Sequence, residues 1–213
     1  MSVAHIEFLV EELSMEAALR TLVPKIIGDQ SFEVYPYQGK HDLLGKLPAR
    51  LLGYARWLLE DWRIVVVMDR DDDTCDTLKC RLEDMALDAR LVTRNAAGGA
   101  SYQVVTRLAI EELEAWYFGD WQAVLSAYPR TARNIPRRQQ FRDPDAIAGG
   151  TWEALERVLQ RGGHFVTGLR KIEAARSIAQ HMDPERNRSH SFQVFRDALR
   201  EMTAAAVSSP HQS

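Results

Sequence analysis

The chain has 213 residues, 46% of them apolar and 27% charged, which is the composition of an ordinary globular protein with its own core. Two cysteines without disulfide or metal-site spacing predict a reducing, cytoplasmic setting, and the sequence predicts neither a signal peptide nor a membrane span. Of 27 Lys or Arg and 30 Asp or Glu, 14 and 8 lie between residues 130 and 200, which leaves 13 and 22 elsewhere. This basic segment can bind a polyanion, or it can simply attract the acidic remainder of the chain.

Strands and helices are predicted to alternate along the first 128 residues. The apolar patterns predict strands at residues 4–12, 31–37, 62–69 and within 102–112. Helices are expected at residues 14–27, 41–61, 73–88 and 113–128. Pro24 should kink or shorten the first helix, and Pro48 should interrupt the second. Such alternation is typical of an α/β fold with a mostly parallel central sheet flanked by helices.

The segment after residue 128 has a different composition. Residues 129–150 are rich in Pro, Arg and Asp and should run irregularly over the surface, and helices are expected at residues 151–161, 170–182 and 191–206. We therefore predict an α/β domain over residues 1–128 and a basic helical part over residues 129–205 packed on it. Residues 206–213 should form a disordered tail.

Acidic residues follow two of the predicted strands. The stretch VVVMDRDDD ends a central strand, and the acids expected at strand ends are Glu11, Glu12, Asp69 and Asp71. Because ligands bind beyond the carboxyl ends of parallel strands, these side chains can converge at one edge of the sheet. Carboxylates arranged in this way suit Mg²⁺ or Mn²⁺. Alternatively, acids at a helix start simply favour the helix dipole, a role that fits Asp72 and Asp73.

A second acidic block, AIEELEAWYFGD, follows the last predicted strand. Glu112 or Glu114 can serve as a further metal ligand near this strand-to-helix junction. The alternative is a helix start that favours acids, with Trp116 and one of its aromatic neighbours in the core.

Basic residues suggest how a phosphate could be bound. Lys171, beside Arg170, can neutralise a phosphate near the metal, and Lys40 can do so at a helix start. Four further arginines in the irregular segment can follow a nucleic-acid backbone, namely Arg133, Arg137, Arg138 and Arg142. All of these side chains can equally be solvated, and Lys40 can belong to an ordinary turn.

The block NRSHSF, residues 187–192, also has two interpretations. His190 can approach the acidic site, or Ser189 or Ser191 can cap the last helix.

Four separated blocks resemble a known family. FLVEELSMEAAL, VVVMDRDDD, AIEELEAWYFGD and NRSHSF occur in this order over roughly residues 3–200 and resemble the bacterial domain-of-unknown-function family 4276. That group is similar to the Toprim domains of topoisomerases, primases and overcoming-lysogenization-defect nucleases. Toprim proteins have a glycine directly after their glutamate, whereas this chain has Glu12.

The resemblance implies roles for particular residues. Glu11 corresponds to the Toprim glutamate, which binds metal or acts as a general acid/base, and Glu16 resembles a further acid of nuclease-type members. Asp69 and Asp71 correspond to the Toprim aspartate pair. We therefore expect a Toprim-like fold and a Mg²⁺- or Mn²⁺-dependent nuclease with Lys171 as a second catalytic residue, working on DNA or RNA in phage defence or repair. The alternative is a non-catalytic module that binds nucleic acid or a partner and works with a separate ATPase.

Overall fold

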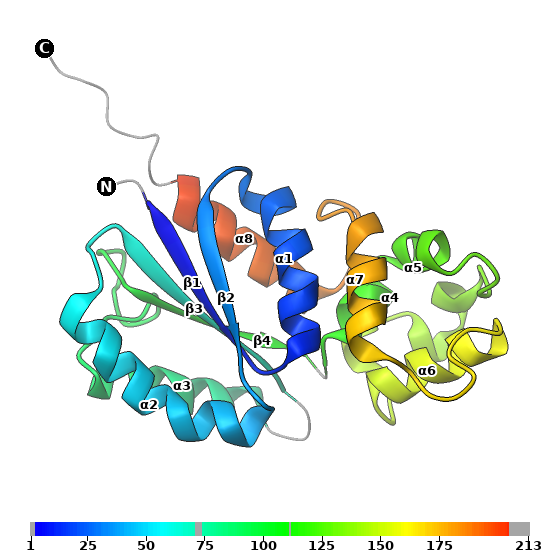
Figure 1. Ribbon diagram of the computed structural model, residues 1–213, viewed down its shortest axis with the longest axis horizontal. Coiled ribbons are helices and arrows are strands. Elements are labelled where there is room, and N and C mark those ends of the chain that lie inside the picture. Colours follow the sequence, from blue (N-terminus) through cyan, green and yellow to red (C-terminus); the bar gives the residue numbers. More distant parts are fainter. Residues whose placement is uncertain (1–2, 71–73, 111, 205–213) are drawn as a thin grey trace, which may run out of the picture.

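A parallel sheet forms the centre of the protein. The computed structural model describes residues 3–70, 74–110 and 112–204. Within them lies a four-stranded sheet in the order β2-β1-β3-β4, with every neighbouring pair parallel (Figure 1). Its strands are β1 (His5–Val10), β2 (Ser31–Pro36), β3 (Trp62–Asp69) and β4 (Val104–Ala109). The predicted α/β class and parallel sheet are confirmed.

Helices cover both faces of the sheet. One face is covered by α1 (Leu13–Ile27) and α8 (His190–Ala204), and the other by α2 (Lys40–Trp57) and α3 (Cys75–Asp88) (Figure 1). Alternate residues of one strand serve the two cores, so Val65 and Val67 pack towards α1 while Val66 packs towards α2. Burial on both sides explains why β3 is apolar almost throughout.

The predicted interruption of the second helix at Pro48 was wrong, and Pro24 does not shorten the first helix. Pro48 lies inside α2, which continues past it, and Pro24 lies inside α1, which runs to Ile27. In α2 the buried face of Leu43, Leu47 and Leu51 packs on the sheet. This packing stabilises the helix more than the lost backbone hydrogen bond weakens it.

The remaining helices form a lobe beside the carboxyl ends of the strands. They are α4 (Glu114–Gly119), α5 (Trp121–Ala127), α6 (Thr151–Arg161) and α7 (Lys171–His181) (Figure 1). Short 3-10 turns interrupt the irregular segment between α5 and α6, at Ile135–Arg137, Gln139–Phe141 and Pro144–Ala146. The helix expected over residues 113–128 is divided at Asp120, which leaves the helical conformation with φ −120° and ψ 69°. The predicted tail, residues 206–213, lies outside the described residues.

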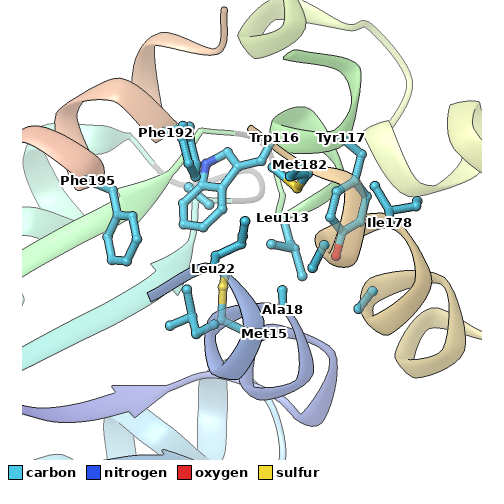
Figure 2. Close-up of a cluster of buried hydrophobic side chains, with 14 of the residues drawn as sticks. Met15, Ala18, Leu22, Leu113, Trp116, Tyr117, Ile178, Met182, Phe192 and Phe195 are labelled. Atoms are coloured by element: carbon cyan, nitrogen blue, oxygen red, sulfur yellow. The ribbon is translucent and has the colours of Figure 1, made fainter. Parts of the chain in front are cut away.

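An aromatic cluster joins the lobe to the sheet. Figure 2 shows Trp116 of α4 between α1, which contributes Met15 and Leu22, and α8, which contributes Phe192 and Phe195. The Trp116 ring stacks on Phe195 at 5.1 Å, and its indole N–H donates to Ser191 Oγ at 3.0 Å. The lobe therefore has a fixed place beside the strand ends. No helix in the described ranges is both long and apolar enough to span a bilayer.

The NRSHSF block supports this junction. Ser189 Oγ accepts the N–H of Phe192 at 3.2 Å, which caps the start of α8. Asn187 donates to the Trp116 carbonyl at 2.9 Å. These contacts bear out the interpretation of the block as a helix cap.

Candidate functional site

Glu11 and Asp69 lie side by side at the carboxyl ends of adjacent strands. β1 and β3 pair in parallel up to Val10 and Val67. Glu11 directly follows Val10, and Asp69 lies two residues after Val67. The Asp69 N–H donates to Glu11 Oε2 at 3.2 Å, and both residues are buried. This is the arrangement that the strand order predicted. Asp71, the other acid of the expected pair, lies outside the described residues.

Lys171 approaches these acids from the first turn of α7. Its Nζ lies 4.0 Å from Glu12 Oε1 and 5.3 Å from the centre of the Trp152 ring. Burial lowers the pKa of Lys171, but nearby carboxylates outweigh this effect and raise the pKa overall. The carboxylates that act on it are those of Glu114, Glu12, Glu112 and Asp69. Lys171 therefore stays positively charged among these carboxylates.

Glu114 is the most deeply buried of these acids. Only 2% of the residue is exposed, and burial raises its pKa to about 7, against the opposing effect of Lys171. Within the described part of the chain, its Oε2 atom has no hydrogen-bond partner, and the same holds for the hydroxyl of Tyr117 one turn later. Burial also raises the pKa of Tyr117 well above its usual value. Among the described residues, one carboxylate oxygen and one hydroxyl on the same helix face thus have no hydrogen-bond partner.

Glu112 is engaged by the start of α6. Its Oε2 accepts the backbone N–H groups of Thr151 and Trp152 at 3.0 and 2.9 Å and the Thr151 hydroxyl at 2.8 Å. These donors are the otherwise unpaired groups of a helix N-terminus. The carboxylate therefore joins the end of β4 to α6, and its assignment as a metal ligand stays a prediction.

The other predicted site residues have local partners. Glu16 pairs with Arg20 at 2.9 Å on α1, and Lys40 donates to the Arg70 carbonyl at 2.9 Å. Arg170 pairs with Glu173 at 2.7 Å. The structure brings together Glu11, Asp69 and Lys171, while Arg133, Arg137 and Arg138 are exposed on the irregular segment of the lobe.

An open pocket of about 730 Å³ lies beside Glu12, the residue that follows Glu11. The start of α1, the turn after β2 and the start of α7 form its walls, so Glu12 and Lys171 line it from two sides. Leu13, Tyr37 and Ile172 also line it, and no motif in the sequence pointed to these three residues. The sequence did contain one sign of them, because Leu13 directly follows Glu12 and Ile172 directly follows Lys171.

The donor atoms of this edge suit a hard divalent ion. No three His, Cys, Asp or Glu side chains within residues 3–70, 74–110 and 112–204 are grouped so that they could hold a metal ion. However, Mg²⁺ commonly binds through one or two carboxylates together with substrate phosphate and water. Glu11 and Asp69 supply two carboxylates from neighbouring strand ends, where the Asp69 N–H donates to Glu11 Oε2.

Comparison with known families assigns the chain. The family model described as a domain of unknown function (DUF4276) matches residues 10–200. The protein belongs to this family. Searches of curated proteins and of solved structures give no match. The further similarity to Toprim domains stays a prediction.

Proposed function

We propose that the protein is a divalent-metal-dependent phosphodiesterase that hydrolyses nucleic acid. The observation that carries this proposal is the pairing of Glu11 with Asp69 at the carboxyl ends of neighbouring parallel strands. Glu12, which directly follows Glu11, lines an open pocket together with the half-buried cation Lys171. A site for hydrolysis needs both a place for the substrate and charges that favour the transition state.

The charge of the edge requires a cation. The carboxylates at the strand ends would by themselves repel a phosphate. Glu11 and Asp69 would hold Mg²⁺ or Mn²⁺, which offsets phosphate charge and lowers the pKa of a bound water.

The protein's own residues would bind and orient the substrate. Lys171, held near Glu12 and Trp152, would place a fixed positive charge beside the phosphate without reorganisation. Arg133, Arg137 and Arg138 are exposed and would bind the backbone through phosphate contacts. Binding should therefore weaken as the salt concentration rises.

Cleavage of labelled oligonucleotides tests the proposal. We expect slow cleavage of DNA or RNA with Mn²⁺ and none with EDTA. Asp69→Asn and Glu11→Gln should abolish cleavage because each removes a charge with little change in size, whereas the control Asp84→Asn on the exposed face of α3 should cut normally. Absence of cleavage with both metals, or an active Asp69→Asn protein, would overturn the proposal.

Thermal unfolding tests metal binding separately from catalysis. An ion that binds only the native acids stabilises the fold by about 2.7 kcal/mol at a concentration 100 times its Kd. Mn²⁺ should therefore raise the Tm of the wild-type protein and of Asp84→Asn, and it should do so much less for Asp69→Asn. Equal shifts in all three proteins would place the ion elsewhere.

A non-catalytic function is the second candidate. It is favoured by the lack of any cluster of three potential metal ligands among the described residues. In that case the protein would bind nucleic acid or a partner such as a separate ATPase. Binding to nucleic acid that depends on Arg137 and Arg138 but not on Asp69, with no cleavage, would support this candidate.

A further inference from the structure

The pocket beside the acids has walls of two kinds. Its surface is mainly apolar, with contributions from Leu13, Tyr37 and Ile172, but it also includes charged side chains of α7. Its volume of about 730 Å³ lies within the range of small-molecule sites in proteins. A ligand that fits it should combine an apolar body with a polar or charged part.

The apolar side chains are unusually exposed for their position. Leu13 is 52% exposed on α1 and Ile172 is 37% exposed on α7, and each directly follows a charged residue of the acidic site. Tyr37, on the turn after β2, also lines the pocket and is partly buried, with contacts to the core on the α2 face of the sheet. Large apolar groups left open on several sides of one hollow are typical of a binding surface. An aromatic ring among them suits a flat partner.

The charged side chains indicate the sign of the ligand. Arg170 and Lys171 are adjacent at the start of α7, and both line the pocket. Across the pocket, the Lys171 ammonium lies 4.0 Å from Glu12 Oε1, and Glu12 directly follows Glu11 at the end of β1. A ligand phosphate near Lys171 would therefore lie close to the proposed reaction centre.

We propose that this pocket holds one unpaired nucleotide, with its base against Tyr37, Leu13 and Ile172 and its phosphate towards Lys171. The inference rests on the proposed function, whose substrate class it narrows to single-stranded nucleic acid or single-stranded ends. A base inside a duplex is stacked and paired, so it presents no free face to such a pocket. Stacking on an aromatic ring accepts every base, so the pocket selects for strandedness rather than sequence.

Binding of an oligonucleotide that contains 2-aminopurine tests the proposal directly. With Ca²⁺ in place of Mn²⁺, the fluorescence of the base should fall as it stacks in the pocket of the wild-type protein. Tyr37→Ala should weaken binding about tenfold, in line with the loss of one stacked base, and Tyr37→Phe should retain it. Leu13→Ala should also weaken binding, while its matched control Leu52→Ala, with a leucine 51% exposed on α2, should not.

The cleavage assay separates this inference from the proposed function. Preference for single strands over duplexes that falls in Leu13→Ala but not in Leu52→Ala supports the inference. Equal cleavage of both substrates by wild type and Leu13→Ala overturns the inference and leaves the proposed function intact. Base quenching that depends on Tyr37 and Leu13 without any cleavage overturns the proposed function and leaves the nucleotide pocket intact.

Discussion

Two buried acids of the helical lobe, Asp120 and Glu114, differ in how far hydrogen bonds and opposite charges offset their burial. Asp120 accepts hydrogen bonds from Arg186 at 2.6 and 2.9 Å and from the Asp183 N–H at 2.8 Å. Glu114 lies six residues earlier and is equally inaccessible, yet its Oε2 has no hydrogen-bond partner within the described residues. The first acid is fully compensated, and the second is not.

The difference separates a structural acid from a candidate functional one. A buried charge is costly unless hydrogen bonds and an opposite charge offset it, and the partners of Asp120 meet that requirement. The Asp120 contacts join α4 and α5 to the segment that leads into α8. Glu114 instead faces Lys171 and other carboxylates at the strand ends. Buried polar groups that remain uncompensated gather at functional sites.

The largest effect is expected from Asp120→Ala. This change leaves Arg186 without its buried partner and the Asp183 N–H without its acceptor. Arg186 itself is 42% exposed, but three hydrogen bonds to one buried carboxylate are lost, and each hydrogen bond to a charged group is worth about 1.5–3 kcal/mol. We therefore expect the unfolding free energy to fall by about 3–5 kcal/mol. Urea unfolding should show a loss of this size.

A surface acid provides the control for that experiment. Asp197 pairs with Arg196 but has a side chain 61% exposed, so Asp197→Ala should change the free energy of unfolding by less than about 1 kcal/mol. Similar losses in the two variants would contradict the distinction between compensated and exposed acids.

The contacts of Asp120 also show where sequence-based prediction stops. β3 was predicted with its observed bounds because a strand buried on both faces is apolar throughout. The break between α4 and α5 was missed because it depends on Arg186, 66 residues away. The predicted interruption at Pro48 was also wrong, because packing of α2 on the sheet keeps the helix continuous there.

The candidate site divides in the same way. The adjacency of Glu11 and Asp69 follows from the geometry of parallel strands, so the sequence predicted it. The contact of Glu112 with Thr151 depends on how the lobe folds back, and no local pattern encodes it. Sequence thus predicts what a strand end presents, and tertiary packing decides what surrounds it.

A smaller effect, dependent on pH, is expected from Glu114→Gln. Burial raises the pKa of Glu114 from the usual 4.5 to about 7 in the folded protein, so the folded state binds this proton more tightly than the unfolded chain does. The stability from this group is complete below pH 4.5 and is lost as the pH rises through 7. Because the glutamine stays neutral, the unfolding free energy of the variant should exceed that of the wild type by up to about 3 kcal/mol at pH 8. The difference should be small at pH 4.5.

Urea unfolding in EDTA at the two pH values checks this prediction. The exposed residue Glu60 supplies the control, and Glu60→Gln should show no such pH-dependent difference. An equal effect of Glu114→Gln at both pH values would mean that its carboxyl is not held protonated by burial.

The smallest effect concerns Glu112, which lies at the acidic edge but is bonded as fully as Asp120. Glu112→Ala removes the acceptor for Thr151 and Trp152 and should cost about 1–2 kcal/mol, the usual range for a lost helix cap. Glu112→Gln keeps an oxygen acceptor of the same reach and should lose less. Urea unfolding without metal measures both changes. If Glu112 belongs with the compensated acids, Glu112→Gln should also keep the wild-type Tm increase with Mn²⁺, which Asp69→Asn loses. If Glu112→Gln also loses that increase, Glu112 is a metal ligand and belongs with the functional acids rather than the structural ones.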